Sequence, residues 1–517
     1  MTATRSRSPL RLGLTERADA RRIDVLHSLA QQSKGELGQF MTPAPIAEFM
    51  ASMFPAPSSR HIRILEPGAG IGSLVAAFVE RACTQFSSIE RISITAYEID
   101  ADLCVRLHET LDDCVRSAET RNVTVEYEIR NRDFVDHARH SIEGDLFGGT
   151  ERFTHVVTNP PYRKVASDSA HRALLRLVGI EATNLYSGFV GLALKLLAHD
   201  GDLVAITPRS FCNGPYFEPF RRLLLSLSTL RQVHTFQSRD AAFRDERVLQ
   251  ENIIYAVSRA GRPKTVRLST SNGPEFRRHK ARIVPYAEVV RPDDPDLLIH
   301  LPMTPGDDEV IRKLSGLTHS LQDLGITVST GPVVEFRLRD FIRQRPVGAT
   351  VPLLYPSHFR NGKLVWPRLG GRKPNAIVNS DETRKWLMPS GCYTITRRFS
   401  SKEEKRRIVA AVLDPGGLDG TLVGIENHLN VFHQDGHGLD PVVAAGLCAY
   451  LNSTLVDQYF RLFNGHTQVN ASDLRALRYP ALPELTALGK KLNGSQPSQV
   501  LLDKWVAAVV LRCRTAA

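Results

Sequence analysis

The amino-acid sequence predicts an α/β protein in which a doubly wound, mostly parallel sheet is followed by a mixed α+β domain. Between residues 62 and 207, short β-branched runs alternate with stretches of helical periodicity, as in consecutive βαβ units. Beyond residue 260 this rhythm is lost, and short strands are separated by many Pro and Gly residues. We therefore expect a basic arm and helix over 1–35, a doubly wound domain over 36–260 and a mixed domain over 261–517.

Composition narrows the class of protein. The 517 residues are too many for one ordinary core, and the net charge of +11 fits a phosphate-rich partner. The seven cysteines are scattered and never form a C-x-x-C pair, which indicates a reduced, cytoplasmic protein without a metal site. No apolar stretch approaches the ~20 residues of a membrane span, and the first residues have no apolar signal core.

The first motif follows a helix expected near residues 15–32. It contains Phe40, Thr42 and Pro43, and apolar residues at helical spacing come after it. Thr42 occupies the expected N-cap position and Pro43 the first helical position, so free backbone N–H groups are predicted there. Such a helix start suits a carboxylate, although a plain cap before a structural helix explains these residues equally well.

A glycine-rich loop follows the strand predicted at 62–66. Glu66 ends that strand, and Gly68, Gly70 and Gly72 come next, with Ser73 where a dinucleotide fingerprint requires glycine. The Glu66 carboxylate would repel a pyrophosphate but attract an ammonium and a sulfonium. The loop therefore favours S-adenosylmethionine over NAD.

Two further strands, predicted at 92–96 and 123–129, also end in acidic residues. Glu98, beside Ile99, lies about 30 residues after the first strand and is placed to accept hydrogen bonds from two ribose hydroxyls. Asp133 is placed to accept from an adenine amino group, and Phe134 to stack on the ring. An exposed acid at a strand end is the alternative for Glu98.

The central motif is Thr158 to Tyr162, directly after the apolar strand predicted at 153–157. The Asn159 side-chain oxygen and the Pro160 carbonyl can together grip both N–H groups of an aromatic amine and free its lone pair for methylation. Pro161 stiffens the turn, and Tyr162 offers a flat face to the substrate ring. An ordinary strand-to-helix turn is the alternative.

The remaining candidates lie later in the chain. A polar loop over 237–250 contains Phe243, and Ser401 with Glu404 predicts a capped helix that carries a basic face. His428 and His433 have no acidic or thiolate partner in a motif, so we interpret them as structural. The residues expected to contact nucleic acid are Arg337, Arg339, Arg398, Lys402, His466, Gln468 and Asn470.

With these motifs in this order, the chain resembles the gamma class of N6-adenine DNA methyltransferases, and over nearly its whole length the modification methylases of the PstI/BsuBI type. The resemblance implies double-stranded DNA as substrate, base flipping, a separate cognate restriction endonuclease and a monomeric enzyme. It also suggests a short palindrome such as CTGCAG as the recognition site. It implies a target adenine held by Asn159, Pro160 and Pro161 and stacked on Tyr162 and Phe243. The cofactor residues that it implies are Phe40, Thr42, Pro43, Glu66, Gly68, Gly70, Glu98, Ile99, Asp133 and Phe134.

Two other functions remain open from the sequence. RNA methyltransferases and protein-glutamine methyltransferases share the Asn-Pro-Pro-Tyr motif, but neither needs a basic C-terminal domain of this size. A DNA-binding module with an inactive methyltransferase fold is the second alternative, which disagrees with the presence of every expected catalytic residue. Methylation assays on DNA, RNA and protein separate these alternatives.

Overall fold

The computed structural model describes residues 12–515 except 30–40, 145–150, 237–250, 260, 262, 274–275, 277–278, 292–293, 361–362, 401–403, 419, 466 and 493. The chain divides into two compact units. The first comprises Met1–Cys212 and Tyr216–Met303, and the second Asn213–Pro215 and Thr304–Ala517. Among the described residues, no helix is both long enough and apolar enough to cross a membrane.

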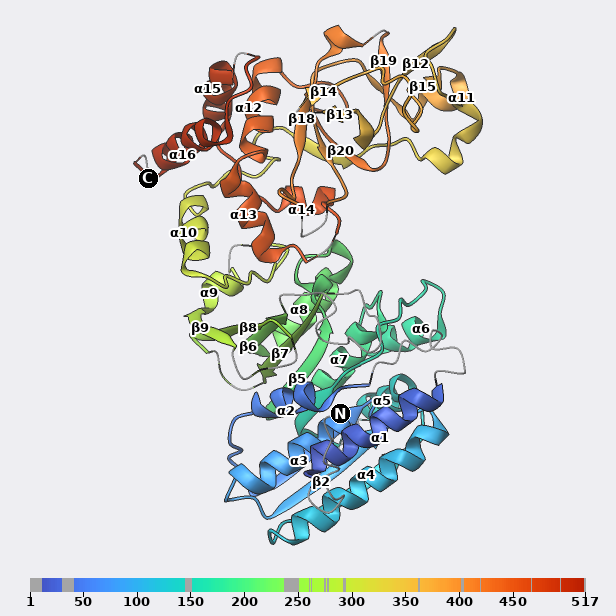
Figure 1. The fold of residues 1–517 in the computed structure, drawn as a ribbon, viewed down its shortest axis with the longest axis vertical. Coiled ribbons are helices and arrows are strands. Elements are labelled where there is room, and N and C mark those ends of the chain that lie inside the picture. The colour runs from blue at the N-terminus through green and yellow to red at the C-terminus, as the bar shows by residue number, and fades with distance from the viewer. Residues whose placement is uncertain are drawn as a thin grey trace, which may run out of the picture. The chain divides into compact units, whose positions relative to one another are not determined.

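The first unit is built on a nine-stranded sheet of order β3-β2-β1-β4-β5-β7-β6-β8-β9 (Figure 1). Only β7 and β9 run antiparallel to their neighbours. The strand order reverses between β1 and β4, and in such sheets ligands bind at the carboxyl ends of the strands at this point. The strands are β1 His61–Pro67, β2 Arg91–Tyr97, β3 Thr124–Arg130, β4 Phe153–Thr158, β5 Leu197–Pro208, β6 Thr229–Phe236, β7 Asn252–Ser258, β8 Thr265–Ser271 and β9 Lys280–Pro285.

Helices cover both faces of this sheet because right-handed crossovers place them on opposite sides once the strand order reverses. Helices α1 to α4 pack together on one face, and α5 to α8 form the opposite layer (Figure 1). One continuous core lies between the sheet and these layers. The helices are α1 Leu14–Leu29, α2 Ala44–Ser52, α3 Ser73–Gln85, α4 Ala101–Glu119, α5 Phe134–Glu143, α6 Ala170–Leu177, α7 Leu185–Leu196, α8 Glu218–Leu227 and α9 Tyr286–Val289.

The doubly wound sheet is therefore confirmed, but its limits differ from those expected. Strands β8 and β9 pair in the same sheet, so the first unit continues to Met303 and not to the boundary predicted at residue 260. The basic composition that suggested a boundary belongs to these two strands and their loops.

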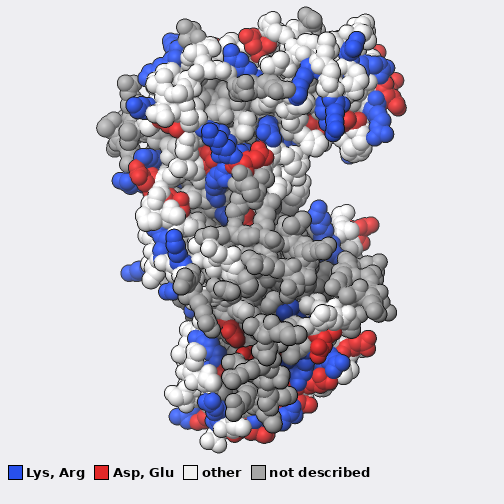
Figure 2. Space-filling model, viewed as in Figure 1, with Lys and Arg blue, Asp and Glu red and all other residues white. Residues whose placement is uncertain are grey.

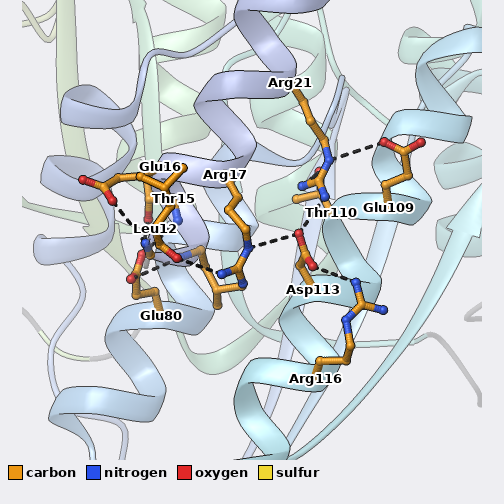
Figure 3. A network of polar contacts seen from close by, with 12 residues as sticks. Leu12, Thr15, Glu16, Arg17, Arg21, Glu80, Glu109, Thr110, Asp113 and Arg116 are labelled. Carbon is orange, nitrogen blue, oxygen red and sulfur yellow. Dashed lines mark hydrogen bonds and ion pairs between the residues drawn. The ribbon is translucent and has the colours of Figure 1, made fainter. Parts of the chain in front are cut away.

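Helix α1 likewise belongs to the first unit and packs on α3 and α4. Figure 3 shows the polar contacts that fasten it. Glu80 accepts hydrogen bonds from the backbone N–H groups of Leu14 and Thr15 and from the Thr15 hydroxyl, and Asp113 pairs with Arg17, Arg21 and Arg116.

The second unit contains a four-stranded antiparallel sheet, β10-β20-β17-β18, and a five-stranded mixed sheet, β11-β15-β12-β19-β16. One apolar core is formed by residues of both sheets, and a second is formed by β12, β15 and neighbouring segments. A helical group that includes α12 and α15 packs beside them. The strands are β10 Thr327–Thr330, β11 Ile342–Arg343, β12 Thr350–Leu354, β13 Phe359–Arg360, β14 Lys363–Leu364, β15 Ala376–Val378, β16 Leu387–Pro389, β17 Tyr393–Arg397, β18 Ala410–Leu413, β19 Leu422–Ile425 and β20 Leu429–His433. The helices are α10 Pro305–Leu314, α11 Asp381–Arg384, α12 Pro441–Leu451, α13 Thr454–Phe463, α14 Ala471–Arg475, α15 Leu482–Leu492 and α16 Gln499–Thr515.

Candidate active site

A pocket opens at the carboxyl ends of β1, β2 and β4, where the strand order of the first unit reverses. Most of the catalytic and cofactor-binding residues predicted from the sequence meet here, although they are spread over more than 100 positions of the chain. The predicted residues that line the pocket are Thr42, Glu66, Gly68, Gly70, Glu98, Ile99, Asp133, Phe134, Asn159 and Pro161.

The glycine loop forms the floor of this pocket. Gly68, Gly70 and Gly72 all have positive φ, the left-handed region that favours glycine. At Gly72 a Cβ atom would also lie 2.7 Å from a methyl carbon of Leu107 in α4, so a side chain there would push the loop away from the helix. The Gly70 N–H donates to the Glu98 carboxylate at 2.7 Å, which joins the ends of β1 and β2.

Two buried carboxylates face this loop. Glu66 accepts a hydrogen bond from the Val75 N–H at 3.1 Å, and Glu98 accepts from Gly70 and Asp100. Burial raises the pKa of Glu66 well above its usual range, and the charge of Glu98 adds to the shift. Burial also raises the pKa of Glu98, although the backbone N–H groups oppose the shift. Because burial is the largest cause of both shifts, a cationic ligand that pairs with these carboxylates would be favourable.

Both carboxylate oxygens of Asp133 already have hydrogen-bond partners within the protein, which the sequence did not predict. One of its oxygens caps α5 by accepting from the N–H groups of Val135 and Asp136, and the other lies 2.8 Å from Nε2 of His171. Burial acts to raise the pKa of Asp133, but the hydrogen bonds from His171 and the backbone hold it below its ordinary value. The same contact raises the pKa of His171.

Asn159 follows β4 with its carboxamide held on both sides. Its Nδ2 donates to the Thr42 hydroxyl at 3.1 Å, and its Oδ1 accepts from the Tyr162 hydroxyl at 2.9 Å. The Tyr162 hydroxyl also lies 3.3 Å from the Ile206 carbonyl oxygen, and its single hydrogen serves one acceptor at a time. The amide is thus oriented before a substrate binds.

The contact with Asn159 corrects the role predicted for Thr42 at the start of α2. The helix begins at Ala44 with Pro43 as its N-cap residue, and no side chain caps it. The Ala44 N–H donates instead to Asp19 of α1 at 3.1 Å. The Thr42 hydroxyl therefore serves Asn159 and not the helix.

Comparison with known proteins shows the family of the chain. The chain is 42% identical over 506 residues to the Type II methyltransferase M.BsuBI from Bacillus subtilis, covering 97% of this chain and 99% of that one. The chain belongs to the M.BsuBI family of Type II methyltransferases. M.PstI from Providencia stuartii is 41% identical over 98% of both chains, and a profile of the Eco57I restriction-modification methylase family matches residues 87–243. In fold, the chain is similar to the Type IIL restriction-modification enzyme MmeI, with a TM-score of 0.55 at 10% identity over 98% of this chain and 75% of that one.

The protein is thus a DNA methyltransferase of a restriction-modification system that uses S-adenosylmethionine. The pocket fits this cofactor, because two buried carboxylates with raised pKa values face a loop of left-handed glycines.

Several predicted residues lie away from the pocket wall. Pro43 and Pro160 are not among the residues that line the pocket, and neither is Tyr162, of which only 8% is exposed. The ring of Tyr162 packs edge-on against Tyr186, with 6.3 Å between centroids. Four predicted residues lie outside the described residues, namely Phe40, Phe243, Lys402 and His466.

The second unit of the methyltransferase corrects three expectations. The described residues 404–409 form no helix, and Arg407 is buried, donating to Ser400 and Asn464. Asn470 and Asp473 form a capping box at the start of α14, so Asn470 has a structural role. His428 has an acidic partner after all, because Glu426, two positions earlier, turns back towards its ring.

Other predicted contacts of the second unit remain accessible. Arg337 is exposed, with its guanidinium 5.5 Å from the ring of Phe336, and Arg339 is exposed nearby in the chain. Arg398 and Gln468 are half-buried and belong to neighbouring segments of one surface.

The methyltransferase pocket also contains residues that the motifs did not predict. His171 lies on α6, Phe189 on α7 packs against Phe134 with centroids 5.1 Å apart, and Arg163 follows the central motif. Phe189 sits in a continuous apolar helix, where nothing separates a pocket residue from a core residue. For His171 no neighbouring motif gives a signal.

Proposed function

We propose that this methyltransferase transfers the methyl group to N6 of an adenine in double-stranded DNA. The observation that carries the proposal is the orientation of Asn159, whose carboxamide is held by Thr42 and Tyr162 at the wall of the cofactor pocket. A neutral amide at this position suits an amino group, which needs acceptors for its two N–H groups and does not need a strong base.

The chemistry follows from the nature of an aromatic amine. Its lone pair is delocalised into the ring, so it is a poor nucleophile. Acceptance of one N–H by Asn159 Oδ1 and of the other by the Pro160 carbonyl would draw the nitrogen towards tetrahedral geometry and localise the lone pair. The Tyr162 hydrogen can turn to the Ile206 carbonyl oxygen and leave Oδ1 to the substrate. S-adenosylmethionine supplies the electrophilic methyl group.

Each residue that we assign to the cofactor contacts the part of S-adenosylmethionine that matches its chemistry. Glu98 accepts from the two ribose hydroxyls, and Glu66 faces the positively charged end of the cofactor. Asp133 accepts from the cofactor's adenine amino group, because an oxygen that already contacts His171 keeps a second lone pair. Phe134, buried and at the pocket wall, packs against the adenine ring. We assign Thr42 and Pro43 to the carboxylate end of the cofactor, and Gly68, Gly70 and Ile99 to the floor and rim of the pocket. Phe40, which lies outside the described residues, is assigned to the carboxylate end from its sequence motif.

Base flipping completes the proposal. In B-form DNA the N6 atom is paired and stacked, and it cannot reach a pocket at a sheet edge without leaving the helix. Stacking on Phe243 and on Tyr162, which is only 8% exposed and would have to become accessible, would offset the cost of a few kcal/mol. A mismatch opposite the target adenine is therefore expected to tighten binding.

The remaining roles concern partners. We assign DNA contacts in the second unit to Arg337, Arg339, Arg398, Lys402, His466 and Gln468, and withdraw Asn470 because it caps α14. A monomer acting in the cytoplasm beside a separate cognate endonuclease fits an enzyme that modifies each strand in its own event.

A substrate panel tests this function. The protein is incubated with S-adenosylmethionine labelled in the methyl group and with duplex DNA containing CTGCAG, genomic DNA, total RNA or a glutamine-rich protein. We expect label only in DNA. The genomic DNA should be labelled whatever the recognition sequence is. Label in RNA or protein with none in DNA would support the alternative functions that share Asn-Pro-Pro-Tyr.

A further inference from the structure

We propose that His428, together with Phe399 and Gln468, contacts DNA bases and sets part of the sequence specificity. This inference rests on the proposed DNA substrate and adds residues for its recognition. The surface formed by these three side chains is called the 428 surface below.

Three segments far apart in the chain meet at the 428 surface. The Arg398 N–H donates to the His428 carbonyl at 2.9 Å, and the Val469 N–H donates to the Arg398 carbonyl at 2.7 Å. An isolated antiparallel bridge joins Phe399 to Gln468. These main-chain bonds place His428, Phe399 and Gln468 side by side at the ends of β17 and β20, on a backbone that is fixed without any ligand.

Glu426 holds the imidazole of His428 in one orientation. The Glu426 side chain is fully buried, and both of its oxygens contact His428. Oε1 lies 2.5 Å from Nδ1, and Oε2 accepts from the backbone N–H at 2.9 Å. Burying a carboxylate is costly unless it is paired. Here the pairing fixes which ring nitrogen faces the protein, because Nδ1 must carry a hydrogen to meet a carboxylate.

The other ring nitrogen of His428, Nε2, can bind a ligand. His428 has 48% of its side chain exposed, and among the described residues Nε2 has no hydrogen-bond partner. A side chain whose rotamer and tautomer are fixed by a buried partner is suited to recognition, since little freedom is lost on binding. A histidine whose only role is packing does not require a hydrogen bond from its ring to a buried carboxylate.

The turn that carries Glu426 is itself tightly held. Val333 donates to the Ile425 carbonyl at 3.0 Å, and Asn427 donates to the Val333 carbonyl at 2.9 Å. At Gly331 a Cβ atom would lie 2.4 Å from the Glu426 carbonyl oxygen, so only glycine lets β10 approach this turn so closely. The His428 ring is therefore supported by fixed main chain and not by a free loop.

The chemistry of the 428 surface favours nucleic acid. Phe399 is 39% exposed, and its ring centroid lies 5.0 Å from that of His428. Exposed aromatic rings stack on bases or wedge between base steps, while imidazole and amide groups form hydrogen bonds to base edges. From Thr304 onwards the chain has 27 Lys and Arg against 19 Asp and Glu, so the second unit carries +8 of the total +11. Figure 2 shows Lys and Arg spread over the face of this unit in view.

The test is a specificity profile of His428→Ala. Sequencing of modified bases in host DNA first gives the recognition site. Then kcat/KM is measured on a duplex with that site and on duplexes that each carry one changed base pair. The matched control is His437→Ala, an exposed histidine beyond the opposite end of β20.

We expect His428→Ala to lower the preference for the correct base at one or two positions by about tenfold, the effect of losing one base contact. Preference at the other positions, S-adenosylmethionine affinity and the melting temperature should stay close to wild type. His437→Ala should change none of these. Glu426→Gln should reproduce the loss at the same positions, and it keeps the test informative if His428→Ala proves unstable.

Two outcomes would overturn the inference. An unchanged profile in both variants would show that the 428 surface reads no base, and would favour a protein partner there. An equal loss of kcat/KM on every duplex would assign His428 to the DNA backbone. Absence of DNA methylation by the wild-type protein would instead contradict the proposed function and is recognised before any variant is made.

Discussion

The two units of this methyltransferase use buried carboxylates in opposite ways. In the first unit, Glu66 and Glu98 accept backbone hydrogen bonds, and burial raises the pKa of both. In the second unit, Glu426 is buried as deeply, but both of its oxygens are taken by His428. Glu66 and Glu98 line the pocket, where we propose that they contact S-adenosylmethionine, whereas Glu426 holds a side chain of its own unit.

Asp113 shows what a carboxylate with permanent partners looks like within the first unit. It pairs with Arg17, Arg21 and Arg116 (Figure 3), and its pKa is held below the ordinary value although burial acts to raise it. Asp113 therefore has its positive partners within the fold, whereas burial is the largest cause of the raised pKa values of Glu66 and Glu98.

The largest effect is expected at the neutral amide of Asn159. Asn159→Ala should lower kcat by a hundredfold or more, the scale seen when one preorganised polar group is lost, while S-adenosylmethionine binding is largely kept. Single-turnover kinetics and calorimetry measure the two quantities separately. Turnover near that of wild type would mean that a group other than the amide activates the amine.

The second effect concerns Glu98, the carboxylate that we assign to the cofactor ribose. Glu98→Ala removes a charged acceptor from the proposed ribose site and should weaken S-adenosylmethionine binding by about 1.5–3 kcal/mol, or roughly 10- to 150-fold. Calorimetric titration measures this change. Asp113→Asn, a carboxylate change outside the pocket, is the control and should leave the affinity unaltered, so equal losses in both variants would remove the distinction between the two kinds of acid.

The third effect is the pH dependence of cofactor binding. In the proposed site Glu66 must be ionised to attract the cationic end of the cofactor, and Glu98 must be ionised to accept from both ribose hydroxyls, and the pKa values of both are raised. Affinity should therefore fall as the pH drops through the raised pKa values, by up to tenfold per pH unit for each group. The profile of Glu98→Gln should be shallower because only Glu66 still titrates. Parallel profiles would exclude Glu98 as a titrating group.

The smallest effect is on folding stability. Asp113→Asn should lower the free energy of unfolding by about 1–2 kcal/mol, since partly exposed arginines lose a charged partner. The wild-type contribution is present above the unfolded-state pKa of Asp113 and is lost as the pH falls through the lower folded-state pKa. Urea unfolding at neutral and at acidic pH checks this, and a difference that does not shrink in acid would contradict the ion-pair account.

Sequence motifs predicted the sheet and ten residues of the pocket because parallel strands carry their functional residues at one end. Glu66 lies at the end of β1, and Glu98, Asp133 and Asn159 come shortly after β2, β3 and β4, so short local patterns were sufficient. Contacts between distant segments were not predictable in this way. The bond between Thr42 and Asn159 spans 117 positions, and nothing near either residue marks it.

The second unit was harder to predict for the same reason. Its surface joins segments near residues 398, 428 and 468, which come together only through sheet pairing. Glu426 precedes His428 by two positions, a spacing that in an extended strand would place both side chains on one face without implying a contact. The turn before β20 brings the carboxylate to the ring.

The central claim is that the pocket activates an exocyclic amine of adenine. DNA methylated by the protein is digested to nucleosides, and the methylated nucleoside is identified by mass spectrometry against standards. The account predicts N6-methyldeoxyadenosine, which disappears with Asn159→Ala. N4-methyldeoxycytidine or 5-methyldeoxycytidine as the product would contradict it.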